Sequence, residues 1–148
     1  MSERFDEDAL LRDARSMDGL EDFGDAAFRE PLRVLLASLV DAPLNELGQM
    51  ILRGTVVRSL ANRLRIEHWF AQNPDIARER IKAPLVIVGM MRSGTTLVQR
   101  LLAQDPDNYF TLGWEAMEPA PRLAVEPGAP DPRIASAEKR EKQSRTFA

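Results

Sequence analysis

The residues of this chain best suited to chemistry lie in PLVIVGMMRSGTTLVQRLL, residues 84–102. There an apolar, β-branched run ends at Gly89, a short turn follows, and an apolar pattern with helical spacing begins near Thr95. The first amides of a helix have no partner within the helix, and the helix dipole places partial positive charge at the same end. Glycine allows the turn to bend sharply and a phosphate to approach the backbone. The stretch therefore predicts a phosphate-binding turn in front of a helix.

This turn differs from a triphosphate-binding P-loop at one position. Gly89 and Gly94 have the spacing of the pattern G-x-x-x-x-G-K-[ST], but Thr95 stands where the lysine is expected. In that pattern the lysine contacts the β- and γ-phosphates, so a triphosphate with its Mg²⁺ would lose its main cation here. The turn instead offers one cation and three hydroxyls, from Arg92, Ser93, Thr95 and Thr96. Such a set suits a single phosphate group.

Periodic leucines predict that residues 1–83 form a helical region. The predicted helices are residues 6–17, 28–42 and about 44–70, followed by a short helix from Pro74 to about Lys82. Pro31 falls in the first turn of the second helix, and Asn73 is the predicted N-cap of the last one.

Residues 84–148 change character and predict the opening of an α/β domain. Leu85 to Gly89 is typical of a buried parallel strand, and Asp105–Pro106 stops the helix after the turn. Residues 108–115 predict a second strand or an extended segment, and a last helix begins with Asp131 as cap and Pro132 in first position. A three-layer α/β domain needs several parallel strands, so one or two strands predict an incomplete domain.

Composition excludes several kinds of site. The 148 residues carry a net charge of −3 and no cysteine, and His68 is the only histidine. Disulfides, thiolate metal sites, a cysteine nucleophile and a multi-histidine metal centre are therefore excluded, and we expect no metal. The pI of about 5.3 opposes the basic surface that nucleic acid requires, so no nucleic-acid partner is expected.

No part of the sequence predicts a membrane partner. No apolar run approaches the ~20 residues that cross a bilayer. The first residues, MSERFDEDALLRDAR, lack the basic-then-apolar order of a secretory signal. We therefore expect a cytoplasmic protein, and nothing in the sequence indicates its oligomeric state.

At the turn, the sequence VGMMRSGTT resembles the 5′-phosphosulfate-binding loop of sulfotransferases, whose usual form is G-x-P-[RK]-[ST]-G-T-T after a strand. Flanking segments extend the likeness from about Leu10 to Ala137, and they look like the bacterial sulfotransferase-like family with a helical N-terminal region. These segments are GLEDFGDAAFREPLRVLL, LANRLRIEHWFAQNPDIARERIKAPLVIVG, LLAQDP, WEAMEPAP and DPRI. Met91 replaces the usual proline, which should loosen the turn more than abolish anion binding.

The resemblance implies a P-loop-type parallel-sheet domain that takes a sulfuryl group from PAPS, 3′-phosphoadenosine 5′-phosphosulfate, and passes it to a hydroxyl or amine of a small-molecule acceptor. Arg92 would contact the bridging oxygen of the leaving 5′-phosphate. The other residues implied to bind the co-substrate are Gly89, Ser93, Gly94, Thr95 and Thr96. The family pattern runs on well beyond residue 148, through its 3′-phosphate site, so this chain is expected to be an inactive N-terminal fragment.

A hydroxyl acceptor also needs a base, and the resemblance directs attention to a glutamate after the helix of the loop. Glu115 is the first candidate and Glu118 the alternative; for either, a helix-start carboxylate or an ion pair is the ordinary interpretation. His68 lies far upstream beside Trp69 and is interpreted as a packed or surface histidine.

Two other functions stay open from the sequence. A P-loop kinase or NTPase predicts a lysine in the turn and an acidic Mg²⁺ ligand ending a second strand, for which only Glu115 is available. A non-catalytic, anion-binding helical protein predicts a core that is complete without a sheet.

Overall fold

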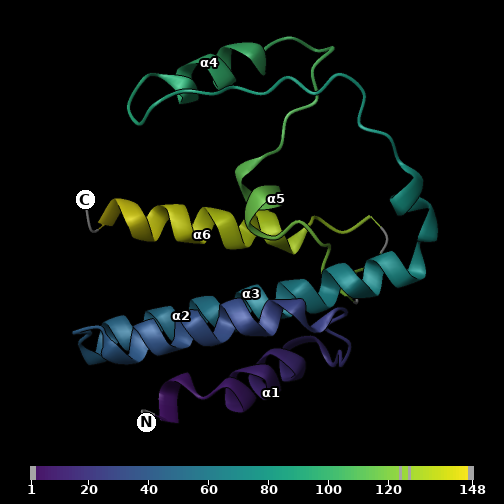
Figure 1. Ribbon diagram of the computed structural model, residues 1–148. Coiled ribbons are helices and arrows are strands. Elements are labelled where there is room, and N and C mark those ends of the chain that lie inside the picture. Colours follow the sequence, from purple (N-terminus) through teal and green to yellow (C-terminus); the bar gives the residue numbers. More distant parts are fainter. Residues whose placement is uncertain (1–2, 124, 127, 147–148) are drawn as a thin grey trace.

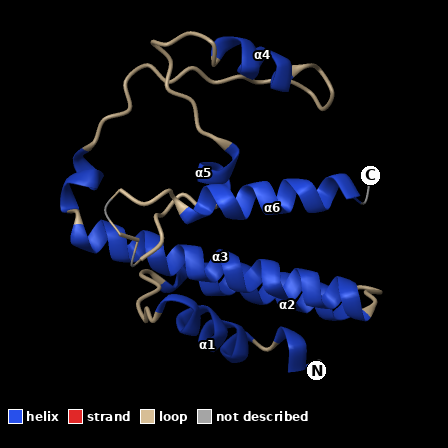
Figure 2. Ribbon diagram, turned by 180° about the vertical axis from the view of Figure 1, so that it is seen from behind, coloured by secondary structure: helices blue, strands red, loops and turns tan. Residues whose placement is uncertain are grey.

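A computed structural model describes residues 3–123, 125–126 and 128–146, and every regular element in these residues is a helix (Figures 1 and 2). The α-helices are α1 Glu7–Asp18, α2 Arg29–Asp41, α3 Glu46–Gln72, α4 Thr95–Leu102, α5 Gly113–Met117 and α6 Pro132–Thr146. Short 3-10 helices cover Glu3–Phe5, Ala26–Phe28 and Pro74–Arg78.

Local capping sets the ends of the first helices. The Asp6 carboxylate accepts a hydrogen bond from the Ala9 amide at 2.9 Å and begins α1, and Gly19 ends it in the left-handed conformation. Asn45 caps α3 in the same way, accepting from the Gly48 amide at 2.8 Å. The predicted helices 6–17, 28–42 and 44–70 are confirmed, with ends within two or three residues of those observed.

The hydrophobic core lies among α1, α2 and α3. Its buried side chains come from all three helices and from the two segments that precede them: Phe5, Leu10, Leu11, Ala14, Phe23, Leu32, Leu36, Val56, Leu60, Ala61 and Leu64. Helix α1 packs along α3, which supplies the largest contact between helices. The helical region therefore has a core built largely on the periodic leucines, although four residues predicted at the same helical spacing are exposed: Met17, Leu35, Leu47 and Ile51.

The predicted strands are absent from the described residues. Residues 84–90 run without a strand partner beside α4, and the segment 108–112 leads into α5 (Figure 1). A strand requires a neighbour for its backbone hydrogen bonds, and no second extended segment of the described chain pairs with residues 85–89. The strand of the predicted α/β unit is thus not confirmed, since the described residues form helices alone.

The other boundaries after residue 72 are mixed. Helix α4 begins at Thr95 and ends before Asp105, as predicted, and α6 begins at Pro132 with the Asp131 carboxylate accepting from the Arg133 amide at 2.9 Å. The short helix predicted to reach Lys82 is a 3-10 helix that ends at Arg78, and the Asn73 side chain does not cap it.

We predict that Leu64→Ala lowers the free energy of unfolding by about 3 kcal/mol, because it removes a fully buried side chain from the core. Leu47→Ala in the same helix is the matched control, since Leu47 is 59% exposed and should cost less than about 0.5 kcal/mol. Urea unfolding followed by far-ultraviolet circular dichroism measures both. Equal losses would place the core elsewhere.

Candidate active site

The predicted phosphate-binding residues come together in one turn between the extended run 84–90 and α4. Gly94 immediately precedes the helix with a φ of 87°, and Arg92 has a φ of 63°. Positive φ is easy for glycine but strained for arginine. Strained residues of this kind concentrate at functional sites, so the Arg92 backbone supports a functional interpretation of the turn.

Gly89 is required by the close fold of the turn. A Cβ atom added at Gly89 would lie 2.5 Å from the Ser93 Oγ and 2.8 Å from the Thr95 Cγ2. The Ser93 amide and hydroxyl both donate to the Met90 carbonyl, at 3.2 and 2.6 Å. These bonds hold the Ser93 side chain over Gly89, so a side chain at residue 89 would have to displace the Ser93 hydroxyl and the Thr95 methyl group.

The start of α4 offers unpaired amides. No side chain caps this helix, and the Gly94 carbonyl accepts from the Leu97 and Val98 amides at 2.9 and 3.1 Å. The amides of Thr95 and Thr96 precede that first helical bond and are left for water or an anion. The turn thus supplies backbone donors and dipole charge at one point.

Arg92 adds the only formal positive charge of residues 89–96. Its side chain is exposed and forms no ion pair with the described residues. A free guanidinium beside uncapped amides can contact one tetrahedral anion. With Thr95 in the lysine position, the turn lacks the second cation that a triphosphate would need.

The structure does not bring Glu115 to this turn. Glu115 lies in the first turn of α5, and no Cα atom of α4 comes within 8 Å of one of α5. Its carboxylate accepts from the Leu112 amide at 2.7 Å and from the Tyr109 hydroxyl at 3.0 Å. The hydrogen bond and the charge of Glu115 raise the pKa of Tyr109. Glu115 therefore caps its own helix, and its role as base stays a prediction.

Glu118, the alternative base, lies buried among arginines. Its carboxylate accepts three hydrogen bonds from Arg122 at 3.1–3.3 Å and one from Arg140 at 3.2 Å, and Arg65 lies 3.6 Å away. We name Glu118, Arg65, Arg122 and Arg140 the Glu118 cluster. Burial by itself would raise the pKa of Glu118, but the arginine hydrogen bonds and charges outweigh it and lower this pKa. A carboxylate held in this way is a weak base.

Comparisons with known proteins agree with the sulfotransferase resemblance of the turn's sequence. Residues 84–147 match the sequence model of the Sulfotransferase family. The crystal structure of sulfotransferase STF1 from Mycobacterium tuberculosis H37Rv is 30% identical over 97% of this chain, with a TM-score of 0.77. These matches support a bacterial sulfotransferase-like family for this chain.

A second solved family structure shares the fold. Sulfotransferase STF9 from Mycobacterium avium superposes on 97% of this chain with a TM-score of 0.80 and 24% identity. The chain spans 40% of the length of STF1 and 37% of that of STF9. A comparison with curated proteins found no match to this chain.

Other candidate sites in the described residues are limited. Among the described residues no group of three histidine or acidic side chains is placed to hold a metal ion, and no helix is long and apolar enough to cross a membrane. His68 is partly buried, with its ring edge-on to Trp69 at 5.7 Å between centroids. This agrees with the packed histidine predicted from the sequence.

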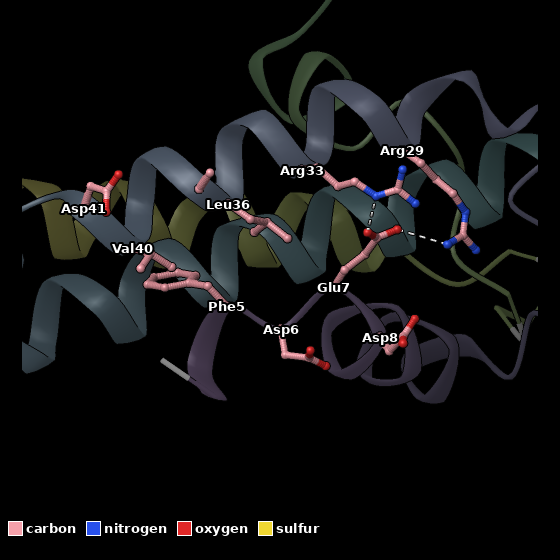
Figure 3. A pocket seen from close by; sticks show the side chains of 10 residues that line it. Phe5, Asp6, Glu7, Asp8, Arg29, Arg33, Leu36, Val40 and Asp41 are labelled. Atoms are coloured by element: carbon pink, nitrogen blue, oxygen red, sulfur yellow. Dashed lines mark hydrogen bonds and ion pairs between the residues drawn. The ribbon is translucent and has the colours of Figure 1, made fainter. Parts of the chain in front are cut away.

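A hollow of about 580 Å³ lies between α2 and the segment that leads into α1 (Figure 3). Its floor is apolar, from Phe5, Leu36 and Val40, and its polar end holds Glu7. Both Glu7 oxygens are occupied, by Arg29 at 3.0 Å and Arg33 at 2.8 Å. These ion pairs join α1 to α2 and leave neither Glu7 oxygen free for chemistry.

Sequence reasoning missed the most buried charge. Arg65 is 4% exposed and donates to Asp18 at 2.7 Å, which links α3 to α1. One signal for this burial was present in the sequence. Arg65 follows Ala61 by four residues, so the two lie on the same face of α3, and Ala61 is fully buried. A buried arginine requires acidic partners, and Asp18 and Glu118 lie too far along the sequence to be assigned from spacing.

We predict that acid loosens the contact of α5 and α6 with α3. Because the pKa of Glu118 is lowered on folding, its ion pairs stabilise the fold above the unfolded value of about 4.3 and are lost as pH falls through the folded value. Both tryptophans report on this contact, since the Trp69 indole donates to the Pro121 carbonyl at 2.9 Å and Trp114 lies under Arg133.

Tryptophan fluorescence measured against pH should shift to longer wavelength below about pH 4. Glu118→Gln should show the shifted spectrum already at neutral pH, because the amide removes the charge that the arginines surround. Spectra of the variant and the parent that coincide at every pH would contradict the structural role of Glu118.

Proposed function

We propose that this chain supplies the 5′-phosphosulfate-binding turn of a sulfotransferase that moves a sulfuryl group from PAPS to a hydroxyl or amine acceptor. The observation that carries the proposal is the uncapped start of α4 behind the closed turn at Gly89, with Arg92 unpaired beside it. The match of residues 84–147 to the Sulfotransferase family and the likeness to STF1 support the same reaction class.

In this reaction the acceptor oxygen or nitrogen attacks sulfur in line, and the bond from sulfur to the bridging oxygen breaks. The acceptor loses a proton to a base, and the nucleotide leaves with a new negative charge on its 5′-phosphate. Catalysis then depends on positioning and on donors directed at that charge. The Thr95 and Thr96 amides and the Arg92 guanidinium are the donors that the turn provides.

The base is assigned to Glu115. Glu118 is unsuited because arginines surround its carboxylate and lower its pKa, which weakens its affinity for a proton. Glu115 is held by one backbone amide and the hydroxyl of Tyr109, an exposed residue that can move away. Proton transfer to Glu115 would require α5 and the turn to approach each other around the two substrates.

Kinase or NTPase chemistry is disfavoured on two counts. Thr95 provides no cation for a γ-phosphate, and Glu115 does not end a strand where a Mg²⁺ ligand of that class is expected. The single free guanidinium instead matches one phosphate and its sulfuryl group.

Binding of 3′-phosphoadenosine 5′-phosphate, the nucleotide product, tests the proposed site. We expect the described turn to supply only the 5′-phosphate contacts, so the dissociation constant should be on the order of 1 mM, about −4 kcal/mol. Backbone NMR spectra should show the amides of residues 92–97 shifting on titration. Arg92→Ala should weaken binding about tenfold, because a charge-assisted hydrogen bond is lost.

Arg100→Ala is the matched control, since Arg100 lies on α4 in its last turn and is exposed. It should leave the dissociation constant unchanged. An absence of amide shifts at residues 92–97 would sink the proposal, and tighter binding of ATP with Mg²⁺ at those amides would favour the kinase alternative. Submicromolar binding of the product nucleotide would show that the chain holds further nucleotide contacts.

The shape of the turn is tested separately from its charge. Gly89→Ala places a Cβ within 3 Å of Ser93 and Thr95, so it should open the turn and weaken nucleotide binding at least tenfold while Arg92 remains. Gly113→Ala is the control, because no atom lies within 4 Å of the added Cβ. The same NMR titration measures both, and unchanged binding by Gly89→Ala would show that the closed turn is not the binding form.

A further inference from the structure

Helix α5 is too short to hold its own position. Its five residues, Gly113–Met117, form little more than one turn, and an isolated turn is unstable in water. The only helix of the described chain whose backbone approaches α5 is α6. The orientation of α5 must therefore come from side chains at its two ends.

The C-terminal end of α5 is held by the Glu118 cluster. The Glu118 side chain is 9% exposed and joins Arg65 of α3 to Arg140 of α6. Arg65 also donates to Asp18 of α1, so one line of ion pairs runs from α1 through α3 to α6. The Glu118 carbonyl is held as well, because the Arg133 Nη1 donates to it at 2.7 Å.

The N-terminal end of α5 is held by the same arginine of α6. The Arg133 guanidinium lies 4.6 Å from the centroid of the Trp114 ring, and its other donors bind the Asp131 carboxylate. Glu115 lies between these two attachments. Its position relative to α3 and α6 therefore depends on residues on either side of it.

We propose that Glu118 is a positioning residue. It holds α5 folded and in place, and so fixes the direction of the Glu115 carboxylate for its role as base. The inference rests on the proposed function, which gives Glu115 that role. Glu118 itself neither contacts substrate nor takes the proton.

The free-energy cost of burying the Glu118 cluster indicates that the cluster positions α5 more than it stabilises the fold. Arg65 Nε and Arg140 Nε and Nη2 are buried and have no hydrogen-bond partner in the described residues. Each such donor loses free energy relative to its hydrated form. Apolar side chains of similar volume often stabilise as well as a buried ion cluster or better, so a set with unmet donors fixes a geometry more than it adds stability.

The single tyrosine offers a direct test in the 148-residue chain. Tyr109 is exposed and donates to Glu115, and its raised pKa depends on that contact. It makes no contact with Glu118. If Glu118 holds α5, Glu118→Gln should release the helix, separate Glu115 from Tyr109 and lower the titration midpoint of Tyr109 toward that of Glu115→Gln. Ultraviolet absorbance of the tyrosinate measures all three chains.

Two further variants complete the experiment. Glu138→Gln makes the same substitution at an exposed position of α6 and should leave the Tyr109 midpoint unchanged. Arg140→Gln removes one partner of Glu118 and should lower the Tyr109 midpoint part of the way. This variant keeps the proposal testable if Glu118→Gln does not fold. A Tyr109 midpoint at the parent value in Glu118→Gln, with tryptophan fluorescence showing that α6 has loosened, would overturn the proposal.

The NMR titration with 3′-phosphoadenosine 5′-phosphate, run in parallel, separates this inference from the proposed function. Glu118→Gln and Glu115→Gln should both leave the amide shifts of residues 92–97 unchanged, because α5 does not approach α4 in this chain. Absence of those shifts in the parent chain would count against the proposed function, while the tyrosine titration still decides the role of Glu118.

Discussion

The arrangement of α5 and α6 depends on the ion pairs of the buried Glu118 carboxylate. The core among α1, α2 and α3 is built from residues before Arg65, and no Cα atom of α5 or α6 comes within 8 Å of one of α3. Side chains must therefore make the connection, and Glu118 reaches α3 and α6 at once. The Trp69–Pro121 hydrogen bond adds a second, weaker link.

Much of this structure could be predicted because its causes are local. Helix caps, first-turn prolines and leucine stripes act within a few residues, and they located α1, α2, α3, α4 and α6. The turn predicted to bind phosphate is local too, since Gly89 and Gly94 lie within six residues of each other and shape its path. Glu118 could not be placed, because its partners Arg65 and Arg140 lie 53 and 22 residues away in the sequence.

The predicted strand shows the opposite limit. The run from Leu85 to Gly89 has strand composition, but a strand is completed only by a neighbour, and the described residues provide none. Side chains typical of a buried strand remain exposed instead: Val86 is 72% and Val88 88% exposed. Helix α4 likewise exposes Leu97 and Leu101. Composition correctly marked an apolar surface, and the described residues do not include the partner that a buried strand needs.

The exposed apolar surface of residues 85–101 could fix the position of the turn relative to Glu115 in the proposed reaction. The turn carries one guanidinium and α5 carries one carboxylate, that of Glu115, but an exposed ion pair contributes at most about 1 kcal/mol. Burying a single valine or leucine side chain contributes about 1.5–3 kcal/mol. Several such side chains lie exposed along residues 85–101, so burial of that face is the larger free energy available to fix the turn. Charge then determines what the turn binds, and apolar contacts determine where it lies.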